Sequence, residues 1–206
     1  MKTAVFVIAK NGFRDEEYFE PKKILTDNGI KVITVSSSAG KCTGKLGAIV
    51  EADMSLDDLK QSDFDAIFFI GGPGASEFFH NNKAHDLLKE AANLNKLHGA
   101  ICISPTTLAF AGILQGKKAT AFPDAENDLR KNGAVWTPLP VVIDGNLITA
   151  NGPQSARDFG ETAQVSVAEP YSVLHRAAAA LAWRGRLCLG YERAAISRLF
   201  RRHPDH

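Results

Sequence analysis

Short apolar runs of strand length alternate along this chain with segments whose apolar residues recur at helical spacing. The runs cover residues 3–9, 31–36, 66–70 and 100–102. A run that is apolar at nearly every position, rich in β-branched and aromatic residues, is typical of a strand buried on both faces of a parallel sheet. Repeated strand–helix units of this kind predict a doubly wound α/β sandwich with a mainly parallel sheet.

The helices and hairpins are predicted from residues that begin or end such elements. Asn28-Gly29 supplies a left-handed helix stop, Ser55 an N-cap, and Pro105 a residue suited to a first helical turn. The predicted helices cover residues 16–28, 55–60, 82–97 and 105–112. Hairpins are predicted within residues 44–53 and between 141–143 and 147–150, across an Asp-Gly-Asn turn.

Composition limits the class of protein. The 206 residues are 45% hydrophobic, enough for a sizeable core without metal or disulfide staples. The three cysteines, Cys42, Cys102 and Cys188, are far apart and include no close pair of the metal or redox type, so we expect no disulfide, no metal and a reducing compartment. No apolar stretch approaches the length of about 18 residues that spans a membrane, and the first run is too short for a signal peptide. A cytoplasmic location is expected.

The basic residues change in kind along the chain. All lysines lie before residue 132, whereas most arginines lie after residue 175. We therefore expect a domain over residues 1–163 and an atypical Arg-rich tail over 164–206. The tail is either a frame-shifted or fused end, or an added helix with an apolar face (Leu174, Ala178 and Leu181) and a basic face.

The formal net charge of +1 gives no reason to expect a nucleic-acid partner. Gly71-Gly72-Pro73-Gly74 lacks the continuation of a phosphate-binding loop, so no cofactor is expected.

Cys102 stands between an apolar strand and a helix opened by Pro105. The chain must turn sharply there and present the sulfur above the sheet, as in a nucleophile elbow. The N–H groups at a helix N-terminus lower the pKa of a nearby thiol and make it reactive. A buried, inert cysteine at the end of a strand is the alternative.

Four segments resemble the ThiJ/PfpI superfamily, which includes the Parkinson's-disease protein and the PfpI intracellular proteases. They are NGFRDEEYFEP (residues 11–21), FFIGGPGASEFF (68–79), GAICISPTTLAFAGIL (99–114) and VVIDGNLITANGP (141–153). The resemblance covers about residues 2–163 and implies a flavodoxin-like fold with an elbow cysteine. It also implies a homodimer or higher homo-oligomer.

The resemblance also implies roles for individual residues. It makes Cys102 the nucleophile and Glu17 its hydrogen-bonded partner, a carboxyl that must be partly buried with a raised pKa. The backbone N–H groups of Gly71 or Gly72, together with that of Ile103, would form the oxyanion hole. Glu77 lies near a position from which a glutamate reaches a neighbouring subunit in the protease-like branch, although a surface role is the simpler expectation.

The histidine bases of the superfamily are missing. Ile103 follows the cysteine where the proteases have a histidine, and Phe122 stands where the Parkinson's-type members have one. His80, His85 and His98 are expected to be surface residues. Peptide hydrolysis would therefore lack an acid for its leaving group, and a cysteine peptidase is the least favoured reading.

Two functions remain open. The first is cysteine-dependent chemistry on a small reactive electrophile, of the glyoxalase, deglycase or hydratase kind. The second is a non-enzymatic oxidative-stress sensor or chaperone-like protein, in which an oxidant converts Cys102 and Glu17 stabilises the oxidised form.

Overall fold

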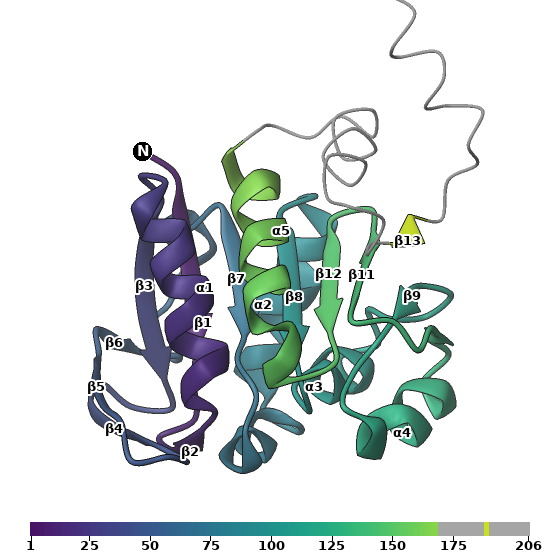
Figure 1. The fold of residues 1–206 in the computed structure, drawn as a ribbon, viewed down its shortest axis with the longest axis horizontal. Coiled ribbons are helices and arrows are strands. Elements are labelled where there is room, and N and C mark those ends of the chain that lie inside the picture. Colours follow the sequence, from purple (N-terminus) through teal and green to yellow (C-terminus); the bar gives the residue numbers. More distant parts are fainter. Residues whose placement is uncertain (169–187, 190–206) are drawn as a thin grey trace, which may run out of the picture.

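The computed structural model describes residues 1–168 and 188–189, and its centre is a mostly parallel sheet between two layers of helices (Figure 1). The strand order is β13-β11-β12-β8-β7-β1-β3-β6. β11 and β12 pair antiparallel, and the other neighbours pair parallel. This confirms the predicted doubly wound, flavodoxin-like α/β architecture. The strands are β1 (Thr3–Val7), β3 (Lys31–Ser36), β6 (Met54–Ser55), β7 (Ala66–Phe69), β8 (Leu97–Ile101), β11 (Val141–Asp144), β12 (Leu147–Ala150) and β13 (Cys188–Leu189).

The longer helices divide between the two faces of the sheet. In Figure 1, α1 and α5 lie side by side in front of the strands, and α2 lies behind them. Among the described residues, no helix is both long and apolar enough to cross a membrane. The helices are α1 (Asp15–Asp27), α2 (Asn82–Asn93), α3 (Pro105–Phe110), α4 (Glu126–Lys131) and α5 (Ala156–Ala168).

Smaller elements surround this sandwich. A three-stranded sheet is formed by β2 (Asn11–Phe13), β4 (Gly40–Gly44) and β5 (Ile49–Ala52), and a two-stranded one by β9 (Lys118–Ala119) and β10 (Val135–Trp136). The described part of the chain also contains four 3₁₀ turns: η1 (Gln61–Asp63), η2 (Pro73–Phe78), η3 (Pro123–Ala125) and η4 (Pro153–Ser155).

The apolar core lies on both faces of the sheet, which explains why the strands are apolar at nearly every position. Along β1, Ala4 and Phe6 pack into the cluster that contains Phe159 of α5. Val5 and Val7 point the other way, into the cluster on the α2 side. Side chains alternate between faces along a strand, so only a run without polar residues satisfies two buried faces.

Two predicted helices needed correction. The helix predicted over residues 55–60 is absent: Ser55 ends β6, residues 56–58 form a turn in which Asp58 N–H donates to the Ser55 hydroxyl at 3.2 Å, as at a helix cap, and the chain then leaves for η1. The helix predicted to reach residue 97 ends at Asn93, because Asn95 takes a left-handed φ of 53° and reverses the chain. Asparagine is among the few residues that tolerate this conformation, which makes it a helix stop.

Other boundaries moved by a few residues. The hairpin predicted within residues 44–53 forms between β4 and β5, so its first strand begins earlier, at Gly40. Residues 11–13, expected as loop, form β2. α3 ends at Phe110, two residues short of the prediction. The hairpin between β11 and β12 forms as predicted.

The folded unit runs past the domain boundary expected at residue 164. α5 continues to Ala168, and Val167 is buried in the cluster on the α1 side. The apolar face expected at Leu174, Ala178 and Leu181 lies outside the described residues. The division into a domain and a tail stays a prediction.

Helices α1 and α5 approach closely at Gly160. A Cβ atom added there would lie 2.7 Å from the Cα of Pro21 in α1, nearer than real Cβ atoms come to backbone. In an isolated helix, Gly→Ala stabilises by about 1 kcal/mol. Here the contact must be relieved by moving one helix against the other.

We predict that Gly160→Ala lowers the free energy of unfolding by about 1–3 kcal/mol, because overpacking outweighs the gain in helix propensity. Urea denaturation followed by circular dichroism measures this. Val165→Ala is the control in the same helix; that side chain is exposed, and its removal should change stability by no more than about 0.5 kcal/mol. A Gly160→Ala protein more stable than the wild type would contradict the close packing.

Candidate active site

Cys102 occupies a strained turn between β8 and α3. Its φ of 65° lies in the left-handed region, where a non-glycine residue costs about 1–2 kcal/mol. Two backbone hydrogen bonds hold it there: Cys102 N–H donates to the carbonyl of Ala150 at 2.9 Å, and Phe122 N–H donates to the carbonyl of Cys102 at 2.7 Å. Strain that neighbouring segments hold in place is characteristic of functional sites.

Glu17 lies in the first turn of α1, and its side chain is fully buried. The N–H of Gly71 donates to Glu17 Oε2 at 3.1 Å. The other oxygen, Oε1, has no hydrogen-bond partner among the described residues. Burial raises the pKa of Glu17 to about 7, although the hydrogen bonds from Cys102 and Gly71 N–H and the charge of Arg14 lower it. The carboxyl can therefore both release and accept a proton near neutral pH.

The pKa of the Cys102 thiol is raised as well. Burial raises the pKa of Cys102 to about 12, and the carboxylate of Glu17 raises it further, against the N–H groups of Gly72 and Ile103, which lower it. The lowered pKa expected from the helix N-terminus is therefore wrong for this site. α3 has only six residues, and its N–H groups do not offset desolvation and an adjacent negative charge. In the resting site the sulfur keeps its proton beside a carboxyl that can take it.

Gly71 brings the two groups together. A Cβ atom at Gly71 would lie 2.4 Å from Cys102 Cβ and 2.5 Å from Glu17 Oε2. Only a residue without a side chain leaves room for this contact. Because its N–H already bonds to Glu17, Gly71 is not free to bind an oxyanion, whereas the N–H groups of Gly72 and Ile103 are the ones that interact with the sulfur.

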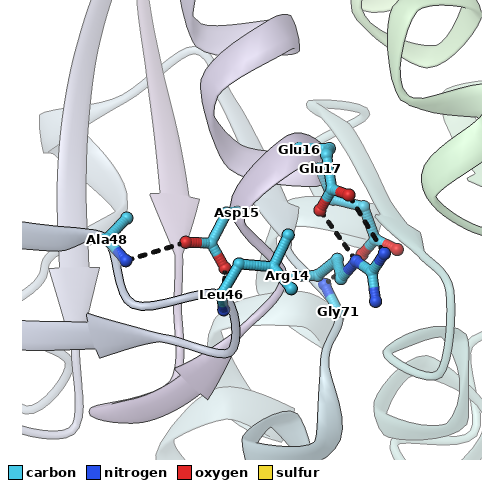
Figure 2. A network of polar contacts seen from close by, with 7 residues as sticks. All are labelled: Arg14, Asp15, Glu16, Glu17, Leu46, Ala48 and Gly71. Carbon is cyan, nitrogen blue, oxygen red and sulfur yellow. Dashed lines mark hydrogen bonds and ion pairs between the residues drawn. The ribbon is translucent and has the colours of Figure 1, made fainter.

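Arg14 and its neighbours hold the start of α1 in place (Figure 2). Arg14 N–H donates to the carbonyl of Gly71 at 2.8 Å, and its guanidinium pairs with Glu16 through Nε at 2.7 Å and Nη2 at 3.0 Å. The buried Asp15 carboxylate accepts N–H bonds from Leu46 and Ala48, at 2.8 and 3.0 Å, and so ties the β4–β5 loop to α1. Arg14 could not be singled out from the sequence, since its approach to the site depends on the Gly71 contact.

The histidines lie elsewhere. His80 stacks on Phe110, His85 bonds to the carbonyl of Phe79, and His98 lies in β8 with Nδ1 beside the carbonyl of Lys96. His98 is buried, so the expectation of a surface position was wrong for it: β8 begins at Leu97, earlier than predicted, and its centre is covered.

Glu77 has structural contacts at the surface. Its carboxylate accepts bonds from Lys10 N–H at 2.8 Å and from the Ser37 hydroxyl at 3.3 Å.

Within the described residues, no three or more His, Cys, Asp or Glu side chains gather in a way that could hold a metal ion.

The DJ-1/PfpI family model matches residues 2–165, and the segments that build this site all fall within that match. This chain belongs to the DJ-1/PfpI family. The solved structure of a ThiJ/PfpI domain protein from Brachyspira murdochii superposes with a TM-score of 0.79 at 32% identity, covering 82% of this chain and 98% of that one. DJ-1beta of Drosophila melanogaster superposes with a TM-score of 0.75 at 28% identity, covering 88% and 97%.

Two other proteins are similar to this chain over most of its length. An uncharacterized protein of Methanocaldococcus jannaschii is 47% identical over 165 residues, covering 78% of this chain and 80% of that protein. A deglycase of Thermococcus kodakarensis is 32% identical over 149 residues, covering 72% and 90%.

Glu17→Gln should lower the pKa of Cys102, because the carboxylate that raises it becomes neutral. The rate of Cys102 alkylation by iodoacetamide, followed by peptide mass spectrometry across pH, measures this pKa. Its midpoint should move down by at least about one unit, the equivalent of 1.4 kcal/mol. Glu20→Gln, an exposed position in the same helix, is the control and should leave the midpoint unchanged. An unmoved midpoint in Glu17→Gln would show that the two groups do not interact.

The pH dependence of stability should also change in Glu17→Gln. The folded-state pKa of Glu17, about 7, lies above its ordinary value of 4.5, so the stability linked to its proton is complete below about pH 4.5 and is lost as pH rises through 7. Relative to Glu17→Gln, the wild type should therefore lose up to ~3 kcal/mol between pH 4.5 and 8. Urea denaturation at several pH values tests this, and parallel curves for the two proteins would contradict it.

Proposed function

We propose that this protein uses Cys102 to attack small reactive carbonyl compounds, with Glu17 as the group that accepts and returns the proton. The observation that supports this most directly is the burial of a carboxyl with a pKa of about 7 beside a strained cysteine. A general base is most effective when its pKa lies near the working pH. The name of the Thermococcus kodakarensis relative, a deglycase, agrees with carbonyl chemistry.

The first step forms a hemithioacetal. The thiol proton moves to the Glu17 carboxylate while Sγ bonds to the aldehyde carbon and the carbonyl electron pair moves onto oxygen. The N–H groups of Gly72 and Ile103 interact with the sulfur and are the donors that would stabilise this developing oxyanion. Glu17 then returns the proton to the oxygen, so that the adduct is neutral.

Turnover of a 2-oxoaldehyde also needs water. For methylglyoxal, hydrogen moves from the aldehyde carbon to the neighbouring carbon, and addition of one water releases lactate and restores the thiol. Peptide hydrolysis fits less well. Ile103 and Phe122 occupy the positions of the family's histidines, and the three histidines described above contact other residues, so within residues 1–168 no imidazolium is placed to protonate an amine.

Cys102→Ser should abolish turnover of methylglyoxal to lactate, and Glu17→Gln should lower kcat by about 100-fold or more, the usual contribution of a positioned proton-transfer group. Lactate release measured with an enzyme-coupled assay gives both values. Glu20→Gln should retain the wild-type rate. Turnover that survives in Cys102→Ser would refute the proposal.

Oxidation sensing is the second candidate, and the unpartnered Glu17 Oε1 favours it. Protonated at this oxygen, Glu17 could donate to an oxygen of a Cys102 sulfinate. A sensor would consume peroxide only in proportion to the protein present, gain two oxygens at Cys102 and show no catalytic lactate release. Lactate release and the consumption of peroxide therefore distinguish the two functions.

The location and assembly of the protein stay proposals. We propose a cytoplasmic homo-oligomer, on the strength of the family alone. A single protomer mass for the full chain in sedimentation equilibrium would refute the oligomer.

A further inference from the structure

Arg14 is the cation that the fold brings to the candidate site. Its backbone N–H bonds to the carbonyl of Gly71 at 2.8 Å, the same residue at which an added Cβ would overlap Cys102 and Glu17. The backbone of Arg14 is therefore held against Gly71, the residue that lies between the thiol and the carboxyl. About a quarter of its side chain is exposed, so a ligand entering from solvent can reach it.

The guanidinium is in electrostatic range of both reactive groups. Besides its bond to Glu16, the carboxylate of Glu17 and the ionised form of Cys102 raise the pKa of Arg14. A cation that interacts with two groups of a site also interacts with an anion bound between them, and more strongly where water is excluded.

The guanidinium of Arg14 has hydrogen-bond donors that Glu16 does not use. A guanidinium carries five N–H donors in a planar fork, and Glu16 accepts through Nε and Nη2. The N–H groups on Nη1 have no hydrogen-bond partner among the described residues. A second polar atom, Glu17 Oε1, is buried beside the thiol and is also unpartnered. Donors left open on Arg14 and an acceptor left open on Glu17 indicate a polar ligand.

We infer that Arg14 binds the carboxylate of an electrophile whose carbonyl carbon meets Cys102, so that small 2-oxo acids are preferred ligands that Cys102 holds as thiol adducts. Glyoxylate is the simplest: its aldehyde carbon would bond to the sulfur while its carboxylate takes the open side of the guanidinium, the geometry in which Arg and carboxylate bind best. This ligand class rests on the attack of Cys102 on carbonyl compounds proposed above, whereas the anion site itself does not.

Glu16 acts against this binding. Its carboxylate already pairs with Arg14 and neutralises part of the charge. Removing Arg14 and removing Glu16 should therefore change the affinity for an anion in opposite directions. A merely structural role of the pair would move both variants in the same direction.

The test compares two alkylating reagents that differ in charge, iodoacetate and iodoacetamide. Both react with the thiolate of Cys102, so the ratio of their rate constants is insensitive to the thiol pKa and reports the preference for an anion. The ratio is measured by mass spectrometry of the Cys102 peptide in wild type, Arg14→Gln and Glu16→Gln. Lys23→Gln is the control, an exposed cation further along α1.

We expect the ratio to fall about tenfold in Arg14→Gln, the effect of one charge-assisted bond, to rise in Glu16→Gln, and to stay constant in Lys23→Gln. A ratio that Arg14→Gln leaves unchanged overturns the inference. If Arg14→Gln does not fold, a ratio in Glu16→Gln that fails to rise overturns it as well.

Methylglyoxal turnover in the presence of glyoxylate separates this inference from the proposed function, because the glyoxylate hemithioacetal has no neighbouring ketone or aldehyde carbon to accept the hydrogen and therefore only inhibits. A ratio that depends on Arg14, combined with methylglyoxal turnover that glyoxylate inhibits less in Arg14→Gln than in the wild type, supports both. A ratio that depends on Arg14 without turnover of methylglyoxal supports the anion site and refutes the enzyme.

Discussion

The close approach of Gly71 to Cys102 and Glu17 is the contact on which the rest of the site depends. Three segments far apart in the chain meet there: the start of α1, the end of β7 and the turn after β8. A side chain at Gly71 would overlap both reactive groups, so the contact exists only because the position is a glycine. It also shuts out water, and desolvation is the largest cause of the raised pKa of both the thiol and the carboxyl.

Desolvation gives the pair a defined resting state. A buried negative charge is costly, and two adjacent ones more so, so near neutral pH the sulfur is protonated and the carboxyl can exist in either form. Such a pair is poor at spontaneous alkylation and well suited to transferring a proton when an electrophile arrives. The positive charge of Arg14 lies on the side of α1 where it offsets the carboxylates of Glu16 and Glu17.

Much of the fold could be predicted because its signals are local. Strands buried on two faces must be apolar throughout, and the amino-acid sequences of β1 and β7 are apolar at nearly every position. The failures have local causes as well. Asn95 ends α2 through a left-handed conformation that asparagine adopts in some contexts and not in others, and Ser55 caps a single turn that the packing of Leu56 and Leu59 then redirects into the core. Neither outcome follows from residue type alone.

By itself, the sequence determined the α/β class, the family and the residues proposed to carry the chemistry, since Cys102, Glu17 and the glycines lie in short segments at strand ends. Only the tertiary structure decided how these groups affect one another. It showed that Gly71 N–H is occupied by Glu17, that the thiol pKa is raised, and that Arg14 lies within range of the site. Strand ends follow from local apolar periodicity, whereas a pKa depends on how many segments exclude water from one point, which no local pattern encodes.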